Sequence, residues 1–332
     1  MAPTSFRAMV VEETPDKGFI RRIQEKKIHD LPKGDVLIKV HYSSLNYKDA
    51  LSAVGNKGVT RRYPHTPGID AAGTVEESQA PDFKPGDEVL VTGYDLGMNT
   101  AGGFGQYVRV PSAWIVPIPA NLSLKTCMIY GTAGFTAGLS LDKLMEAGVT
   151  PEDGEILVTG ASGGVGSMAV ALLAHCGYNV VAVSGKPQAV EMLTALGARK
   201  VLGREEVTDT TGRPLLIQRW AACVDTVGGD VLSYALRSTH SHGVVTCCGN
   251  VASAELNITV YPFILRGVTL IGIDSATTEM PLRRKIWNNF AGPWRLPNLD
   301  LFSSTIELTD LDAHIEKILA GGQVGRRVVH LP

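Results

Sequence analysis

The sequence predicts an α/β chain of two domains, in which a β-rich, barrel-like domain precedes a doubly wound parallel sheet. Three observations predict this fold. An apolar strand, a glycine turn, a helix and a second strand follow one another within residues 155–186. Short strand-like runs separated by turn residues fill residues 1–120, without long helical patterns. Strands and helices then alternate as far as residue 275, and 332 residues suffice for two cores.

The composition narrows the class of protein. Hydrophobic residues make up 44% of the chain and charged residues 19%, which is typical of globular domains. A net charge of −2 gives no reason to expect nucleic acid or an anionic membrane as partner. No apolar run approaches about 18 residues, and the N-terminus lacks the apolar core of a signal peptide. We therefore expect a cytoplasmic protein that acts on a small molecule.

The first domain is predicted to cover residues 1–130, and the tail, residues 276–332, is expected to return to it because it is too short to fold alone. One short helix is expected at residues 46–54, among strands that turn residues such as Pro32, Gly34, Pro85 and Gly86 separate. The expected strands are residues 6–11, 35–40, 88–92, 104–110 and 114–118, with a helix at 310–320 and a last strand at 324–330. This strand spacing favours a small barrel-like domain.

The second domain, residues 131–275, is organised around the loop that follows strand 156–158. Gly160 opens this loop, which continues through Ser162, Gly163, Gly164, Val165 and Gly166 into a helix of small apolar residues. Glycines in such a loop permit the tight turn, the approach of a pyrophosphate and close helix–strand packing. The helix N-terminus offers unpaired N–H groups to phosphates. An ordinary tight turn is the alternative, but the strand–turn–helix–strand context favours a dinucleotide site.

The end of the next strand, residues 180–183, favours NADPH over NADH. NAD sites usually place an acidic residue there to bind the ribose 2′-OH, whereas this chain has Ser184, Gly185 and Lys186. Arg204 follows the third strand, residues 200–202, at the corresponding edge. A hydroxyl and two cations suit a 2′-phosphate. The alternative is that Lys186 and Arg204 are ordinary surface charges.

Further strand and helix patterns complete the sheet. A fourth strand ends at Asp225, a helix is expected at residues 231–238, and further strands are expected at residues 243–248 and 268–273. The strand at 268–273 is predicted to lie at the edge of the sheet, and an apolar edge strand without Pro or Lys invites pairing.

Several stretches together resemble the medium-chain dehydrogenase/reductase superfamily over the whole chain, and in particular its zinc-free, quinone-oxidoreductase-like branch with the NADPH-dependent acryloyl-CoA reductases. These stretches are residues 43–49 (SSLNYKD), 67–70 (PGID), 131–136 (GTAGFT), 158–166 (VTGASGGVG), 183–185 (VSG), 225–228 (DTVG) and 262–266 (PFILR). The resemblance implies a GroES-like catalytic domain, a Rossmann domain that binds NADPH, and a homodimer that pairs the edge strand with its two-fold mate.

The chain departs from the zinc-dependent members of that superfamily at their metal ligands. Positions that hold Cys, His and Cys in those enzymes match Asn46, Ile69 and Gly131, none of which provides a thiolate or imidazole. The lobe of four cysteines that holds their structural zinc is absent, and the five cysteines of this chain contain no CxxC pair. We therefore expect no metal. The resemblance then implies hydride addition to the β-carbon of an enoyl thioester, such as acryloyl-CoA giving propanoyl-CoA, and protonation of the α-carbon.

The resemblance also assigns candidate roles in the first domain. Tyr47 is expected to contact the nicotinamide or to protonate the α-carbon, with a mere wall of the cleft as the alternative. Asn46 is expected to hydrogen-bond the ribose or the substrate carbonyl. Asp49 and Asp70 follow turn-like sequence and are expected to brace backbone or a neighbouring cation rather than to transfer protons.

Two further groups of candidates complete the predicted site. Asn250, Ile264 and Ser275 match positions near the nicotinamide in this branch. Five basic residues are candidates for binding the CoA phosphates, with ordinary surface exposure as the alternative: Lys57, Arg61, Arg62, Arg326 and Arg327. Two other functions remain open from the sequence: an NADPH quinone or enone reductase, and a non-catalytic NADPH-binding protein.

Overall fold

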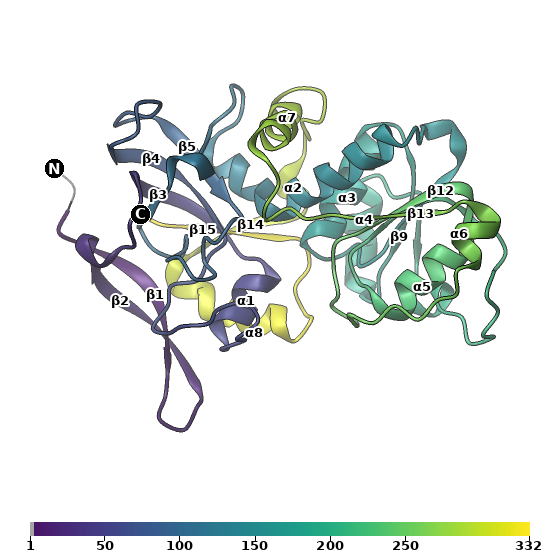
Figure 1. The fold of residues 1–332 in the computed structure, drawn as a ribbon, viewed down its shortest axis with the longest axis horizontal. Helices are drawn as coiled ribbons and strands as arrows, with labels where there is room; N and C mark the ends of the chain where they lie inside the picture. The colour runs from purple at the N-terminus through teal and green to yellow at the C-terminus, as the bar shows by residue number, and fades with distance from the viewer. Residues whose placement is uncertain (1–2) are drawn as a thin grey trace. The chain divides into compact units, whose positions relative to one another are not determined.

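The computed structural model describes residues 3–332, which form two compact units (Figure 1). The first unit contains the chain up to Thr132 together with Ala276–Ala291 and Ser303–Pro332, and the second contains Ala133–Ser275 and Gly292–Phe302. Within residues 3–332 no helix has both the length and the apolarity needed to cross a membrane.

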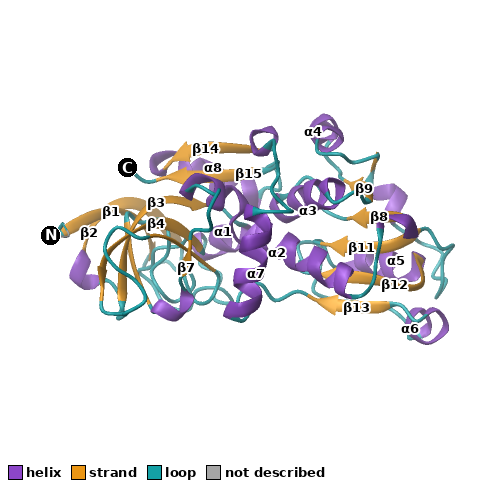
Figure 2. Cartoon of the chain, turned by 90° about the horizontal axis from the view of Figure 1, so that it is seen from above, coloured by secondary structure: helices purple, strands orange, loops and turns teal. Residues whose placement is uncertain are grey.

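The second unit is built on a six-stranded parallel sheet with the order β10-β9-β8-β11-β12-β13, and the predicted doubly wound fold is confirmed. Figure 2 shows the arrows of β8, β9, β11 and β13 pointing the same way. The strands are near-continuous apolar runs because helices cover both faces of such a sheet. The strands are β8 (Glu155–Val158), β9 (Asn179–Val183), β10 (Lys200–Leu202), β11 (Trp220–Asp225), β12 (Thr239–Cys247) and β13 (Thr269–Gly272).

The helices of the second unit connect these strands. The first of them, α3, begins directly after the glycine loop, and its small side chains allow it to pack closely on the sheet. The helices are α3 (Gly164–His175), α4 (Val190–Ala195), α5 (Gly229–Ser238) and α6 (Tyr261–Arg266). A longer helix, α2 (Leu124–Glu146), is interrupted at Gly131, whose φ is 50° and ψ is −158°.

The first unit contains a seven-stranded sheet and a separate two-stranded ribbon. The sheet order is β14-β15-β3-β4-β5-β7, with β6 also paired to β3, and the ribbon pairs β1 with β2. Side chains from β3, β4, β5 and β15 alternate into one apolar core. The strands are β1 (Ser5–Glu13), β2 (Phe19–Lys27), β3 (Val36–Ser44), β4 (Asp70–Ser78), β5 (Glu88–Thr92), β6 (Tyr107–Val110), β7 (Val116–Pro117), β14 (Ser303–Glu307) and β15 (Arg326–His330).

Three helices accompany this sheet: α1 (Tyr47–Ala53), α7 (Met280–Ala291) and α8 (Leu311–Leu319). The apolar side chains of α8 and of α1 share the core beneath the sheet. Helix α7 buries Trp287 and Phe290, and the Phe290 ring stacks on Tyr130 with centroids 4.3 Å apart. This helix lies in a stretch for which the sequence analysis proposed no element.

The tail divides between the units, whereas all of residues 276–332 were expected to return to the first domain. Residues 292–302 group with the second unit. Trp294 and Leu296 are buried, and His175 Nε2 lies 3.2 Å from the carbonyl oxygen of Pro293. Burial of these two large apolar side chains stabilises the segment in the second unit, apart from the rest of the tail.

Candidate functional site

The glycine loop between β8 and α3 is as tight as its sequence predicts. Gly160 has a φ of 57°, which a residue with a side chain rarely adopts. A Cβ on Gly166 would lie 2.3 Å from the carbonyl oxygen of Gly160, so the first turn of α3 passes directly over the loop. Ser162, Gly163, Gly164 and Val165 lie between these glycines, at the N-terminus of a 12-residue helix. The geometry is that of an anion-binding helix N-terminus.

Buried polar side chains join this loop to the loop after β11, and their hydrogen bonds were not predicted from the sequence. Thr159 Oγ1 donates to Asp225 Oδ1 at 2.7 Å, and Thr226 Oγ1 donates to the carbonyl oxygen of Thr159 at 2.9 Å. Asp225 Oδ2 accepts from the Gly228 N–H at 2.9 Å, and burial raises the pKa of Asp225. The loops after β8 and β11 are thereby held in one register. The DTVG stretch was the available signal.

The residues predicted to select the 2′-phosphate lie together at the ends of β9 and β10. The Ser184 N–H donates to the carbonyl oxygen of Leu202 at 3.0 Å, which joins the two strand ends. The Arg204 side chain passes over Gly185 so closely that a Cβ there would lie 2.6 Å from Arg204 Nε. Ser184 Oγ accepts from the Lys186 N–H at 3.1 Å. Arg204 is exposed, so its guanidinium is open to an anionic ligand.

Asn250 and Ser275 lie at this same carboxyl edge of the sheet. Asn250 follows β12 and is next to the loop after β11, since a Cβ on Gly228 would lie 3.2 Å from Asn250 Cα. Ser275 follows the end of β13. The second unit therefore places the glycine loop, the pair Ser184 and Arg204, and these two residues at one edge, where ligands of such sheets bind.

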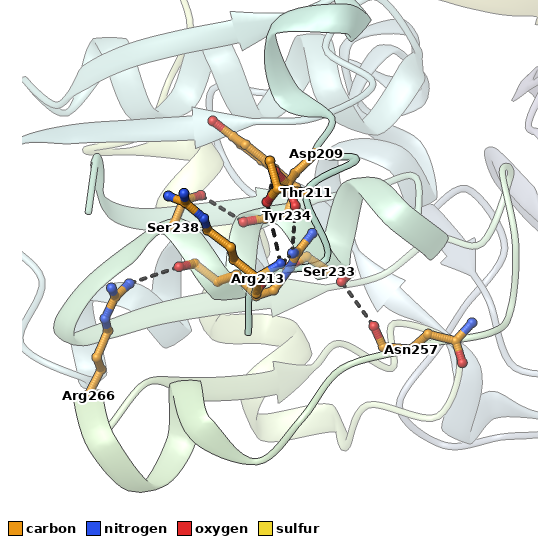
Figure 3. Close-up of polar contacts among 9 residues, drawn as sticks. Asp209, Thr211, Arg213, Ser233, Tyr234, Ser238, Asn257 and Arg266 are labelled. Atoms are coloured by element: carbon orange, nitrogen blue, oxygen red, sulfur yellow. Dashed lines mark hydrogen bonds and ion pairs between the residues drawn. The ribbon is translucent and has the colours of Figure 1, made fainter. Parts of the chain in front are cut away.

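Ile264 lies elsewhere, and its prediction as a cofactor-binding residue is corrected. It belongs to α6, which precedes β13 and therefore lies at the amino edge of the sheet. The end of α6 is fixed there because Arg266 Nη1 donates to the carbonyl oxygen of Arg237, the last turn of α5, at 2.8 Å (Figure 3). The Ile264 side chain is 67% exposed. The resemblance to this branch suggested the cofactor site, but the direction of β13 places Ile264 at the opposite edge of the sheet.

In the first unit, Asn46 is part of a buried polar network (the Asn46 network below), together with Ser44, Asp49, Asp70 and Arg326. Asn46 Oδ1 accepts from Arg326 Nη1 at 3.0 Å, and Asn46 Nδ2 donates to Asp70 Oδ2 at 2.8 Å and to Asp49 Oδ2 at 3.3 Å. Both ends of the amide are therefore occupied within the protein. The prediction that Asn46 hydrogen-bonds ribose or substrate is corrected: its amide is a structural group.

Asp49 and Asp70 brace backbone. Asp49 accepts from the N–H groups of Asn46 and Ile69, both at 2.8 Å. Burial and the neighbouring Asp70 raise the pKa of Asp49 to about 7, although its N–H donors oppose the rise. Asp70 accepts from the N–H and the hydroxyl of Thr132, where α2 resumes after Gly131. It therefore caps that half of the helix.

Tyr47, the first residue of α1, follows Asn46 in the chain but does not belong to the Asn46 network. Its side chain is 37% exposed, and none of the described residues hydrogen-bonds its hydroxyl. The hydroxyl is therefore available to a ligand, and its position depends on the start of α1.

The basic candidates for CoA binding divide into two groups. Arg326 is 1% exposed and bonded within the protein, so its assignment is corrected. Lys57 pairs with Glu13 at 2.9 Å and lies over the ring of Tyr63, but it remains exposed. Burial lowers the pKa of Arg326, while Asp70 and Asp49 oppose the fall. Arg61 and Arg62 are exposed, and Arg327 is half-buried and donates to the carbonyl oxygens of Val324 and Arg326.

The side chains at the positions of the zinc ligands do not fit a metal. The Asn46 amide is occupied as described, and Ile69 is aliphatic and buried. Gly131 has no side chain, and a Cβ there would lie 2.6 Å from both Asp70 Oδ2 and Ser44 Oγ. Zinc requires nitrogen, sulfur or carboxylate ligands with open lone pairs, which this set does not supply.

Sequence profiles of two families match the chain. The alcohol dehydrogenase GroES-like domain matches residues 32–120, and the zinc-binding dehydrogenase family matches residues 164–287. The putative quinone oxidoreductase YhfP of Bacillus subtilis is 43% identical over 99% of both chains. The acrylyl-CoA reductase AcuI of Ruegeria pomeroyi is 42% identical over 98% of both chains.

Solved structures agree with this relationship. The YhdH oxidoreductase from Salmonella enterica, in complex with NADP, has a TM-score of 0.95 at 42% identity and covers 98% of this chain and 100% of its own. Bacillus subtilis YhfP, with NAD bound, has a TM-score of 0.96 at 43% identity and covers 99% and 100%. From the two family matches, the full-length relatives and the shared fold, the chain belongs to the medium-chain dehydrogenase/reductase superfamily, as an oxidoreductase of the branch with the acrylyl-CoA reductases and YhfP-like quinone oxidoreductases.

Proposed function

We propose that this protein is an NADPH-dependent, metal-independent reductase of the activated C=C bond of an enoyl thioester, with acryloyl-CoA or a close analogue as substrate. The observation that carries the proposal is the side-chain chemistry at Asn46, Ile69 and Gly131, where an occupied amide, an alkyl group and a filled space replace metal ligands. Oxidation of an alcohol in this superfamily depends on a Lewis acid, whereas reduction of an activated C=C bond does not. The relationship to AcuI supports the thioester as substrate.

The carboxyl edge of the second unit suits NADPH. The glycine loop and the N-terminus of α3 would hold the pyrophosphate, and Ser184, Lys186 and Arg204 would hold the 2′-phosphate. Asn250 and Ser275 would lie near the nicotinamide. When bound, NADPH supplies the hydride that reduces the β-carbon. The NADP in the YhdH structure supports this choice, while the NAD in the YhfP structure makes cofactor selectivity a necessary test.

Tyr47 is the candidate proton donor in the first unit. Saturation of the double bond also requires a proton at the α-carbon, and a phenol hydroxyl is able to donate one. The Tyr47 side chain is 37% exposed, while the neighbouring Asn46, Asp49 and Asp70 are occupied by one another and by backbone. Arg61 and Arg62, which remain exposed, are candidates for contact with the CoA phosphates.

Reduction of a quinone or enone is the second candidate, because YhfP is named a putative quinone oxidoreductase and is as similar to this chain as AcuI is. Parallel assays of NADPH oxidation with acryloyl-CoA, free acrylate and a simple quinone separate the candidates. The proposal predicts strong preference for the thioester, in kcat/KM, over both others. Preference for the quinone would contradict it. Stabilisation by NADPH without turnover of any of the three would indicate a non-catalytic binding protein.

We further propose that the protein is a homodimer. Among the described residues β13 pairs with β12 alone, so its other edge is open. Exposed apolar side chains also lie in the segment that precedes β13, namely Val260, Tyr261, Ile264 and Leu265. A second copy that pairs β13 with its own β13 about a two-fold axis would satisfy the strand edge and cover this patch.

A further inference from the structure

Arg326 is a charged side chain completely enclosed within the first unit, and its bonds run to distant parts of the chain. Nε donates to the carbonyl oxygen of Ile129 at 3.0 Å, and Nη1 to that of Leu45 at 3.3 Å and to Asn46 Oδ1 at 3.0 Å. Nη2 donates to Ser44 Oγ at 2.8 Å. A buried cation is tolerated where its donors are occupied and a counter-charge is near.

The counter-charge is Asp70, and the side chains of Ser44 and Asn46 bridge it to Arg326 by hydrogen bonds. Ser44 Oγ accepts from Arg326 and donates to Asp70 Oδ2, and the Asn46 amide accepts from Arg326 and donates to the same Asp70 oxygen. Each bridge is directional, because each polar atom has a fixed role as donor or acceptor. The guanidinium therefore determines the orientation of the Asn46 amide.

The network also fills the space beside Gly131. A Cβ at this position would lie 2.8 Å from Arg326 Nη2 as well as 2.6 Å from Asp70 Oδ2 and Ser44 Oγ. The positive φ of 50° at Gly131 further disfavours a side chain. The position that matches a cysteine ligand of the zinc enzymes is thus closed by a protein cation and its hydrogen bonds.

We propose that Arg326 is a positioning residue of the reaction, which fixes Asn46 at the start of α1 and thereby fixes Tyr47, the next residue. The proposal rests on the proposed function, in which Tyr47 acts on the substrate. Tyr47 has no hydrogen bond from its hydroxyl to any described residue, so the backbone at Asn46 is what sets its place. Arg326 itself is too deeply buried to touch a ligand.

Lysine in place of Arg326 keeps the charge but loses the planar fork. One ammonium group is not able to reach Ile129, Asn46 and Ser44 together, because the guanidinium serves them from three different nitrogens. We expect Arg326→Lys to lower kcat at least tenfold while the NADPH dissociation constant changes less than threefold. Hydrogen–deuterium exchange of the amides in residues 45–53 should become at least tenfold faster.

Leu37→Ala is the matched control for a general loss of stability. Leu37 is completely buried in the same unit but in a separate apolar cluster with Phe6, Leu31 and Tyr107. This variant should lower Tm, as a core cavity does, and leave both kcat and exchange at residues 45–53 within twofold. Should Arg326→Lys fail to fold, Ser44→Ala removes one bridge between Arg326 and Asp70 and should change both readouts in the same direction, by about threefold.

The outcomes separate the positioning role from the proposed function. Faster exchange in Arg326→Lys with unchanged kcat would overturn the proposal, because the network would then be structural alone. Equal losses of kcat in Arg326→Lys and Leu37→Ala would also overturn it. If the unmodified protein reduces none of the substrates, hydrogen–deuterium exchange still tests whether Arg326 fixes the start of α1. Faster exchange at residues 45–53 in Arg326→Lys alone supports this role, and unchanged exchange refutes it.

Discussion

Removing the Arg204 guanidinium is expected to weaken NADPH binding while leaving NADH binding nearly unchanged. The side chain passes over Gly185 at the ends of β9 and β10, next to Ser184, and is exposed. A charge-assisted hydrogen bond to a phosphate contributes about 1.5–3 kcal/mol. Its loss corresponds to about a tenfold to hundredfold higher Kd for NADPH. The double change with Lys186→Ala should have a larger effect, since both cations are proposed to contact the same phosphate.

Titration calorimetry with NADPH and NADH on Arg204→Ala, Lys186→Ala and the double variant measures this selectivity. Arg199→Ala is the matched control, because it removes the same charge from an exposed arginine that precedes β10, at the other end of the strand. It should change neither Kd by more than about twofold. The difference between the cofactors should shrink at high ionic strength, as expected of exposed charges. Equal weakening of NADPH and NADH in Arg204→Ala would refute the assignment of the 2′-phosphate site.

Three further changes test other parts of the structure. Tyr47→Phe should lower turnover at least about a hundredfold with unchanged NADPH affinity, because it removes the donor alone; a loss below about threefold in steady-state assays would make Tyr47 a wall of the site. Asp49 has a pKa raised to about 7 by burial and by Asp70, so its protonated form is favoured in the folded protein. Its contribution to stability is fully present below about pH 4 and is lost as the pH rises from there through 7, by on the order of 4 kcal/mol. Denaturant titrations should show this slope in the unmodified protein relative to Asp49→Asn, and identical slopes would contradict the shift. Leu270→Pro removes a backbone donor from β13 and should convert the dimer to a monomer in sedimentation velocity. A monomeric unmodified protein at micromolar concentration would contradict the dimer itself.

The dinucleotide-binding half of the fold could be predicted because its signals are local. Strand, glycine loop and helix follow one another within 32 residues, and the need for glycine at positions 160 and 166 follows from the turn they form. Arg204 was predicted next to Ser184 for the same reason, because adjacent parallel strands end at one edge of the sheet.

Three strands of the first unit, β2, β4 and β14, were not predicted, and the first two show different physical reasons. β2 (FIRRIQEKK) carries mostly charged residues and is a half-exposed ribbon, so it lacks an apolar alternation. β4 (DAAGTVEES) is built from small residues because β3 passes very close: a Cβ on Gly73 would lie 1.9 Å from the carbonyl oxygen of Lys39. Neither the charged pattern of β2 nor the small-residue pattern of β4 indicates a strand when a single sequence is read alone.

The Asn46 network was outside the reach of sequence reasoning. Arg326 pairs with Asn46 across 280 residues of chain, and an arginine near a C-terminus is usually exposed. Its burial depends on Ser44, Asp70 and the carbonyl oxygen of Ile129, which tertiary folding alone brings together. The expectation that Arg326 binds a phosphate was wrong for this reason, whereas the bracing role of Asp49 and Asp70 followed from the turn-like sequence around them.

Metal-independent reduction at the β-carbon is the central claim, and labelled cofactor tests it most directly. The protein is treated exhaustively with a chelator, its zinc content is measured, and acryloyl-CoA is reduced with NADPH deuterated at C4 of the nicotinamide. We expect full activity without stoichiometric zinc, and propanoyl-CoA with one deuterium at C3 by NMR. Activity that tracks zinc at one equivalent per chain, or deuterium at C2, would contradict it.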